Sequence, residues 1–232
     1  MKILSVDTST TTCTVGIVDG DTLVAESVDA SGQTHARHVM GMIDDTLDRA
    51  ALLVRDLEGF AVVTGPGTFT GLRIGISTVK GLAYALSRPL VGISSLAALA
   101  AQADLPAQQV CPVMDARRKE VYFGFYTLAA GVQKQIGPHR VSPPLEMIKN
   151  VRAPCQFIGN GARMYQKMIQ AELGPLALFS ATSRDTVRAE TIAGLAVRQF
   201  QKYDGRQLPD VSPYYIRKSD AELHSTIPAT AD

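Results

Sequence analysis

Apolar and polar residues alternate along the first part of the chain in a way that predicts a β-meander. Three short alternating runs are separated by turns rich in Thr, Ser, Asp and Gly, which favours antiparallel strands joined by tight connections. Apolar residues then recur at a spacing of three or four from Val39 to Val54, as on one face of a helix. The first half is predicted to contain, in order, strands at 2–7, 13–18 and 22–28, a helix at 34–54, a strand at 60–64, a helix at 72–86, a strand at 90–93 and a helix at 94–103.

The second half repeats this order without close residue identity. Its predicted elements are strands at 110–114, 120–128 and 132–137, a helix at 143–150, a strand at 156–158, a helix at 162–173, a strand at 176–179 and a helix at 188–201. The predicted fold class is therefore α/β, with two tandem βββαβαβα lobes and an interlobe cleft. We expect an N-terminal lobe at 1–103, a second lobe at 104–187, and a C-terminal helix and tail at 188–232 that pack back on the lobes.

One glycine-rich stretch, from Gly65 to Gly75, joins the predicted strand at 60–64 to the helix at 72–86. Its sequence, GPGTFTGLRIG, places glycines where positive φ angles and close backbone approach are needed. The amide groups at the start of the following helix offer an anion site. The alternative is a tight strand-to-helix turn that binds no ligand.

Composition narrows the class of protein. The formal net charge of the 232 residues is +1, so bulk charge does not hold the chain on RNA. Cys13, Cys111 and Cys155 are far apart in apolar runs, which indicates reduced, buried thiols rather than a disulfide or a zinc site. No signal peptide and no run long enough to span a membrane stand out, so we expect a cytoplasmic protein without membrane contact.

The repeated unit, with an aspartate-ended strand at the start of each half, resembles the actin, sugar kinase and heat-shock chaperone ATPase superfamily, whose fold is ribonuclease H-like. Four motifs resemble the TsaB family, also called YeaZ, over nearly the whole chain. They are Asp7-Thr8-Ser9, the GPGTFTGLRIG stretch, Asp115-Ala116-Arg117 and Tyr215-Ile216-Arg217.

This resemblance implies a non-catalytic subunit rather than an enzyme. Members of the family bind and support TsaD, which transfers a threonylcarbamoyl group to the adenosine next to the tRNA anticodon, and the ATPase TsaE joins the complex. The resemblance further implies a TsaD heterodimer, a homodimer when the chain is alone, and tRNA bound only indirectly. The alternative function is a stand-alone ATPase or small-molecule kinase of the same fold, and a metalloprotease is a weaker third reading.

The superfamily places its nucleotide between the two halves, which implies a vestigial site in this chain. No cofactor is required, but ATP or ADP is possible at the cleft or at the partner interface. The matching residues are Asp7, Thr8, Ser9, Gly65, Gly67, Thr68, Thr70, Gly71, Asp115, Gly159 and Gly161. Arg117, Arg118 and Lys119 follow the second aspartate and either attract a phosphate or an RNA backbone or form a solvated hairpin tip.

No metal site and no catalytic residue are expected. TsaD-like proteins carry two histidines four residues apart on a helix, where Ser95 and Leu99 stand in this chain, and leucine cannot bind a metal ion. His35 and His38 are an alternative pair, but Arg37 lies between them and no acidic residue is close. His139 and His224 lie in a predicted connector and in the tail, with no partner for nucleophilic catalysis.

The helices predicted at 35–54 and 71–87 carry apolar or small residues beyond one stripe, so a second face is available to a partner. The family resemblance implies that these two helices pack against the equivalent pair of TsaD or of a second copy, with Ile76 as a central anchor. The alternative is that both helices are simply buried within the monomer. The expected interface residues are His35, His38, Val39, Met42, Leu72, Arg73, Ile76 and Lys80.

Overall fold

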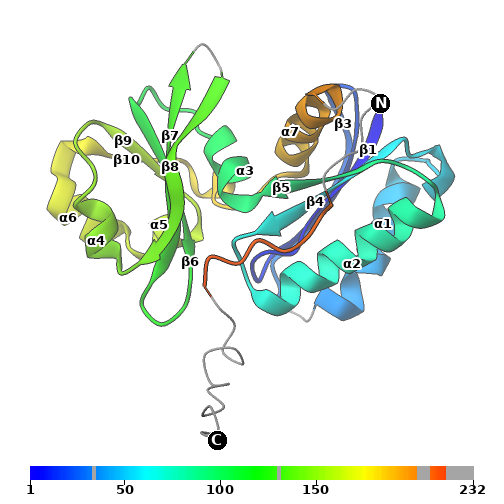
Figure 1. The fold of residues 1–232 in the computed structure, drawn as a ribbon, viewed down its shortest axis with the longest axis horizontal. Coiled ribbons are helices and arrows are strands. Elements are labelled where there is room, and N and C mark those ends of the chain that lie inside the picture. Colours follow the sequence, from blue (N-terminus) through cyan, green and yellow to red (C-terminus); the bar gives the residue numbers. More distant parts are fainter. Residues whose placement is uncertain (33–34, 130–131, 203–209, 218–232) are drawn as a thin grey trace, which may run out of the picture.

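The structure is a computed structural model that describes residues 1–32, 35–129, 132–202 and 210–217. It contains two mixed five-stranded sheets that lie side by side, each partly covered by helices (Figure 1). The predicted α/β duplication is therefore confirmed. Within the described residues, no helix is long and apolar enough to cross a membrane.

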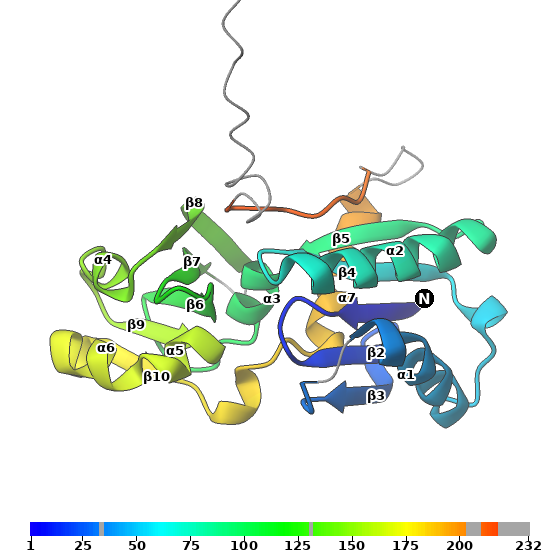
Figure 2. The same ribbon diagram turned by 90° about the horizontal axis from the view of Figure 1, so that it is seen from below.

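The first sheet has the strand order β3-β2-β1-β4-β5, with β1, β2 and β3 antiparallel and β4 and β5 parallel to β1. Its strands are β1 (Lys2–Asp7), β2 (Cys13–Asp19), β3 (Thr22–Asp29), β4 (Gly59–Gly65) and β5 (Leu90–Ser94). Helices α1 (His35–Arg49) and α2 (Phe69–Ala85) lie side by side along one side of this sheet, and α7 (Ala189–Lys202) packs on the other (Figures 1 and 2).

The second sheet repeats the arrangement in the order β10-β9-β6-β7-β8. Its strands are β6 (Gln109–Asp115), β7 (Val121–Ala129), β8 (Val132–Ser142), β9 (Cys155–Ile158) and β10 (Ala177–Phe179). Its helices are α4 (Pro144–Ile148), α5 (Asn160–Met164) and α6 (Gln166–Leu173), and the 3-10 turns of the chain are η1 (Val54–Asp56), η2 (Gly174–Leu176) and η3 (Thr182–Arg184). The last helix of the second repeat, α7, packs on the first sheet.

Three predicted elements need correction in extent. Helix α1 ends at Arg49 instead of residue 54, because Ala51 takes a positive φ of 52° and the Leu52 amide donates back to the Leu47 carbonyl. Strand β8 continues beyond Gly137, whose φ of 70° coincides with a shift of register against β7. The helix predicted at 162–173 is split at Tyr165, where φ is −105°.

One hydrophobic cluster joins the two lobes. Helix α3 (Ser95–Ala101) lies between the sheets, and its Leu96 and Leu99 pack with Val63 of the first sheet and with Val110 and Ile158 of the second. Each of these side chains is almost completely buried. Separating the lobes would expose this apolar surface, so the cluster holds them in a fixed relative position.

The three cysteines are buried and free of disulfides, as their apolar surroundings in the sequence indicate. Burial raises the pKa of the Cys13 thiol to about 12 and raises that of Cys111 well above its usual value. The Cys13 and Cys111 thiols are therefore protonated at neutral pH and act as small apolar side chains.

Candidate functional site

The glycine-rich loop between β4 and α2 packs directly against the turn that follows β1. The Thr68 amide donates to the Ser9 carbonyl at 2.7 Å, and the Thr8 hydroxyl donates to the Gly71 carbonyl at 2.7 Å. A Cβ atom at Gly67 would lie 2.3 Å from the Ser9 carbonyl oxygen, and one at Gly71 would lie 2.1 Å from that of Thr8. Only glycine permits this approach, so the glycines hold the two turns together.

Asp7 ends β1 beneath this contact and is 2% exposed. Its carboxylate accepts the Ser9 amide at 2.8 Å, which closes an Asx turn. Burial raises the pKa of Asp7 to about 6, although the Ser9 hydrogen bond and the charge of His35 favour the ionised form. The predicted phosphate-facing aspartate is thus enclosed by protein.

The second half builds the same turn at the end of β6. The Asp115 carboxylate accepts the Arg117 amide at 2.8 Å, and the Asn160 side-chain carbonyl accepts the Asp115 amide at 3.0 Å. Gly159 and Gly161 pack closely on β6, and the Gly159 amide donates to Asp185 at 2.9 Å. The predicted glycine turn therefore supports its own strand.

The predicted nucleotide residues consequently form two separate groups. Asp7, Thr8, Ser9 and the glycine-loop residues Gly65, Gly67, Thr68, Thr70 and Gly71 belong to the first lobe, and Asp115, Gly159 and Gly161 belong to the second. Of these, Gly67, Thr68 and Asp115 line a common pocket. Thr70 is exposed on the first turn of α2.

Ser95 and Leu99 support the same region. The Ser95 hydroxyl donates to the Pro66 carbonyl at 2.6 Å, which fixes the glycine loop from beneath, and Leu99 lies in the cluster between the lobes. His35 Nε2 lies 2.7 Å from the Thr10 carbonyl and is engaged there. No group of three or more His, Cys, Asp or Glu side chains suited to a metal ion is found in the described part of the chain.

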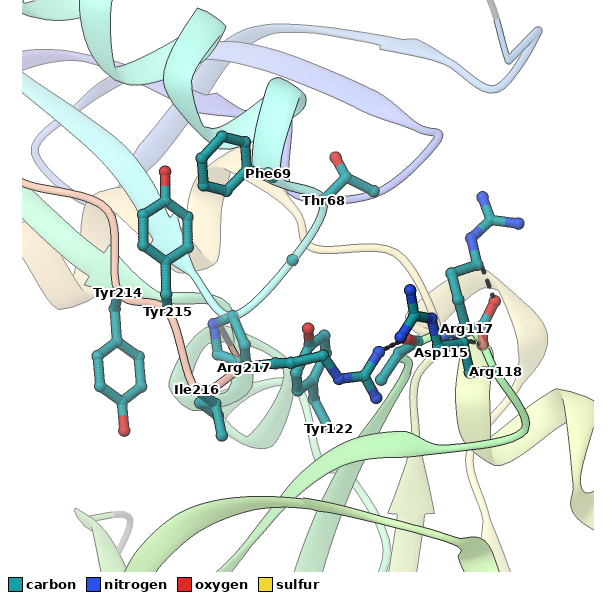
Figure 3. A pocket seen from close by; sticks show the side chains of 13 residues that line it. Thr68, Phe69, Asp115, Arg117, Arg118, Tyr122, Tyr214, Tyr215, Ile216 and Arg217 are labelled. Atoms are coloured by element: carbon teal, nitrogen blue, oxygen red, sulfur yellow. Dashed lines mark hydrogen bonds and ion pairs between the residues drawn. The ribbon is translucent and has the colours of Figure 1, made fainter. Parts of the chain in front are cut away.

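The common pocket lies between the glycine loop, the β6–β7 hairpin and the segment 210–217, with a volume of about 440 Å³ (Figure 3). The first lobe contributes Thr68 and Phe69, and the second contributes Asp115, Arg117, Arg118 and Tyr122. Residues 214–217 complete the wall. The sequence did not assign Phe69, Tyr122 or 214–217 to a site, although the run of aromatic residues in the tail was a visible signal.

The segment 210–217 crosses from one lobe to the other (Figures 1 and 2). The Tyr214 amide donates to the Thr64 carbonyl at 2.8 Å, and the Tyr215 ring stacks on Phe69 with centroids 4.8 Å apart. Arg217 then reaches the second lobe, where it donates to the Ala116 carbonyl at 2.9 Å and forms an ion pair with Glu120. The segment therefore fastens the β6–β7 hairpin beside the glycine loop.

Strand β8 also contacts this segment. His139 lies 2.6 Å from the Tyr126 hydroxyl and packs edge-on against Tyr214, and burial lowers its pKa. The prediction that His139 lies in a connector was wrong, because β8 extends to Ser142. His224 lies outside the described residues.

The β6–β7 hairpin tip has an uncommon backbone. Arg117, Arg118 and Lys119 have φ angles of 60°, 52° and 61°, so three successive residues with a side chain occupy the left-handed region. Each such residue costs roughly 1 kcal/mol relative to glycine. All three are exposed and cationic.

The exposed residues of α1 and α2 differ from the predicted interface. Val39, Leu72 and Ile76 are at most 5% exposed and pack in the core beneath the helices, so the structure corrects their assignment to a partner surface. Their apolar spacing marks the face that covers the sheet. Arg73 is exposed but engages Phe69 and the Tyr215 hydroxyl, whereas His35, His38, Met42 and Lys80 are partly exposed.

A different face of these helices meets solvent. Tyr84 is 90% exposed and Met40 is 45% exposed. Between Ile74 and Ala85, Lys80 is the one charged residue, and it pairs with Asp210 at 2.8 Å. On α1 the charged residues Arg37, Asp44 and Asp45 are also exposed, and the small exposed residues nearby are Ala36, Gly41, Ser77, Gly81 and Ala85. We call this set, with Ile74, Met40 and Tyr84, the helix face.

Replacing the buried Asp7 by Asn tests the enclosure of the first turn. The folded-state pKa of about 6 exceeds the ordinary 3.8, so Asp7 lowers the stability of the fold as the pH rises from about 4 to about 6. The loss is complete above pH 6 and absent below about pH 4. Asp7→Asn keeps an oxygen for the Ser9 amide. We expect its free energy of unfolding, measured with urea, to exceed the wild-type value by about 2 kcal/mol at pH 7.5 and by nothing at pH 3.5. A difference that does not change with pH would contradict the burial of a charged group.

Comparisons with known proteins agree with the geometry. Residues 28–224 match the family model described as TsaD: tRNA N6-adenosine threonylcarbamoyltransferase. The tRNA threonylcarbamoyladenosine biosynthesis protein TsaB of Bacillus subtilis is 30% identical over 225 residues, which cover 96% of each chain.

Solved structures with the same fold agree with this family match. YeaZ from Pseudomonas aeruginosa superimposes with a TM-score of 0.75 at 31% identity, covering 92% of this chain and 99% of that one. Component A of the (R)-2-hydroxyglutaryl-CoA dehydratase of Acidaminococcus fermentans shares the fold alone. It superimposes with a TM-score of 0.51 at 12% identity, covering 85% of this chain and 99% of that one. The two-lobe architecture, the glycine loop and these relatives together show that the chain belongs to the TsaB (YeaZ) family, which is related to TsaD.

Proposed function

We propose that this chain is the non-catalytic subunit that binds and supports TsaD in tRNA threonylcarbamoyladenosine biosynthesis, the process named for its relatives. The observation that carries the proposal is the helix face, a partly apolar surface of mostly small residues on two adjacent helices, with Lys80 as the one charged residue between Ile74 and Ala85. Soluble domains rarely leave such a surface without a partner. Its small residues let another pair of helices approach closely.

A homologous partner suits this surface. The TsaD family model matches most of this chain, so TsaD is expected to present a related pair of helices. Two equivalent pairs pack as a four-helix layer, and in the absence of TsaD a second copy of this chain takes its place. In this proposal TsaE joins the complex through TsaD and is not required for the pairing.

The enclosure of Asp7 supports a role without catalysis. A kinase or ATPase of this fold must bring nucleotide phosphates and a metal ion to carboxylates in the cleft. Here the Thr68 amide is taken by Ser9, and Asp7 is covered. These contacts weigh against a stand-alone ATPase or small-molecule kinase, and no cofactor is needed for the proposed role.

The helix face can be tested at Gly81 without disturbing the monomer. A Cβ atom added at Gly81 meets no other atom within 4 Å, and arginine favours a helix more than glycine does. Gly81→Arg should weaken TsaD binding at least tenfold, because a charged side chain enters a close-packed interface. Binding is measured by isothermal titration calorimetry, and the homodimer by sedimentation velocity.

Gly194→Arg provides the matched control. Gly194 is an exposed glycine of α7, on the opposite side of the first sheet, and an added Cβ there also meets nothing. This variant should bind TsaD normally. Equal binding by both variants would exclude the helix face. Ile76→Asp is unsuitable, since it would place a charge in the core.

Reconstitution tests the function itself. Purified TsaD and TsaE are supplied with tRNA and the threonylcarbamoyl donor, and transfer to tRNA is measured with and without this chain. We expect transfer to fall to background when the chain is omitted, and to be restored equally by wild type and Asp7→Asn, since no chemical step uses that carboxylate. Transfer that does not depend on the chain would reject the proposal. ATP turnover by the chain alone, lost in Asp7→Asn, would establish the kinase alternative.

A further inference from the structure

The pocket between the lobes has features that the proposed function does not use. It combines Arg117 and Arg118 of the cationic hairpin tip with aromatic side chains from both lobes and the segment 210–217 (Figure 3). Lys119 is the third exposed cation of this tip. We propose that this pocket binds an RNA strand directly, with a backbone phosphate at the cationic tip and an unstacked base against Tyr122. The inference deepens the proposed function, since it concerns the RNA on which that complex works.

Charge is concentrated at the tip although the chain as a whole is nearly neutral. The net charge is +1 over 232 residues, yet three successive cations end the β6–β7 hairpin. Asp115 lies 3.8 Å from Arg117, and Glu120 is engaged by Arg217 of the tail. Among the described residues of the hairpin and of 210–217 that meet here, the arginines and lysine outnumber Asp115 and Glu120, and a polyanionic backbone recognises such an excess. The family resemblance implies only indirect contact with tRNA, whereas this local concentration of charge favours the direct contact proposed here.

The backbone of the tip indicates that its side chains have a role. Left-handed φ angles are readily adopted by glycine, and Arg117, Arg118 and Lys119 adopt them at a cost in stability. Such conformations persist where the surroundings enforce them, and they concentrate at binding sites. Here hydrogen bonds between Ala116 and Glu120 and between Arg117 and Glu120 close the hairpin, and Arg217 binds it from outside through the Ala116 carbonyl and Glu120. The cations are thus presented from a fixed turn.

Tyr122 supplies the aromatic surface. Its ring is half-buried on β7, lines the pocket, and lies 6.0 Å from the Arg217 guanidinium. Phe69 is stacked on Tyr215 and lies under Arg73, so it positions the opposite wall. Proteins that bind single strands combine a cationic track with rings on which bases stack.

An RNA strand fits this pocket better than a free nucleotide. In this fold, a free nucleotide would need glycine-loop amides for its phosphates and a metal ion bound by the cleft aspartates. The Thr68 amide already donates to Ser9, and Asp7 is enclosed. The cations stand instead at the open rim, where a strand can run past them.

Paired charge variants of the full chain test the proposal. Arg117→Gln/Arg118→Gln removes two tip charges, and Arg55→Gln/Arg198→Gln removes two exposed arginines from η1 and α7, outside the pocket. Both variants change the net charge equally. Binding of a fluorescein-labelled, mixed-sequence, ten-nucleotide RNA is followed by fluorescence anisotropy from 25 to 200 mM KCl. Urea unfolding verifies that each variant is folded.

We expect the tip variant to bind RNA at least tenfold more weakly at 25 mM KCl. The fall of its binding constant with rising KCl should also be less steep, by the amount that corresponds to the loss of about one phosphate contact. The control variant should bind like wild type. Tyr122→Leu should lower the RNA affinity about tenfold, and Tyr122→Phe should leave it unchanged, because the ring and not its hydroxyl stacks on a base.

Each other result overturns the proposal. Absence of RNA binding by folded wild type at 25 mM KCl excludes a direct site. Equal losses in the two charge variants indicate non-specific attraction. Competition by ATP at equal concentration assigns the pocket to a free nucleotide. The proposed function would survive any of these, because TsaD binding and threonylcarbamoyl transfer are measured separately.

Discussion

The contact between the glycine loop and the Thr8–Ser9 turn determines the character of the first lobe. Gly67, Gly71 and Gly75 bring the start of α2 so close to this turn that a Cβ at any of them would collide with Thr8 or Ser9. The same approach occupies the Thr68 amide, covers Asp7 and sets the direction in which α2 leaves the sheet. The loop predicted as an anion site instead donates its Thr68 amide to Ser9, and the helix that it positions presents the helix face.

Much of the fold could be predicted from the sequence, because alternating and helical periodicity report which side of each element is buried. That principle also explains the main error. Val39, Leu72 and Ile76 were assigned to a partner because the family resemblance places the interface on these two helices, but the apolar stripe to which they belong is the face that covers the sheet. The surface proposed for a partner includes Ser77, Gly81 and Tyr84, whose spacing carries little hydrophobic signal.

The candidate site was less accessible to sequence reasoning. The aspartates and glycines were visible as motifs, but whether an amide faces a phosphate or a carbonyl depends on tertiary approach, as at Thr68 and Ser9. The contacts of the segment 210–217 could not be predicted from the sequence either. Nothing in the local sequence shows that Arg217 reaches Glu120, almost a hundred residues away, or that Tyr215 stacks on Phe69. The positive φ angles of Arg117–Lys119 occur within a hairpin closed by hydrogen bonds between the Ala116 amide and the Glu120 carbonyl and between the Glu120 amide and the Arg117 carbonyl.

The lobes share a core through α3, so the molecule is suited to act as a rigid body, with the proposed helix face on one side and a pocket between its lobes. Hydrogen exchange on the chain bound to TsaD tests this account most directly. Amide protons of α1 and α2 should become protected on binding, while those of β9, α6 and β10 keep their rates. Protection confined to the second lobe, or unchanged exchange across α1 and α2 in a complex that demonstrably forms, would contradict it.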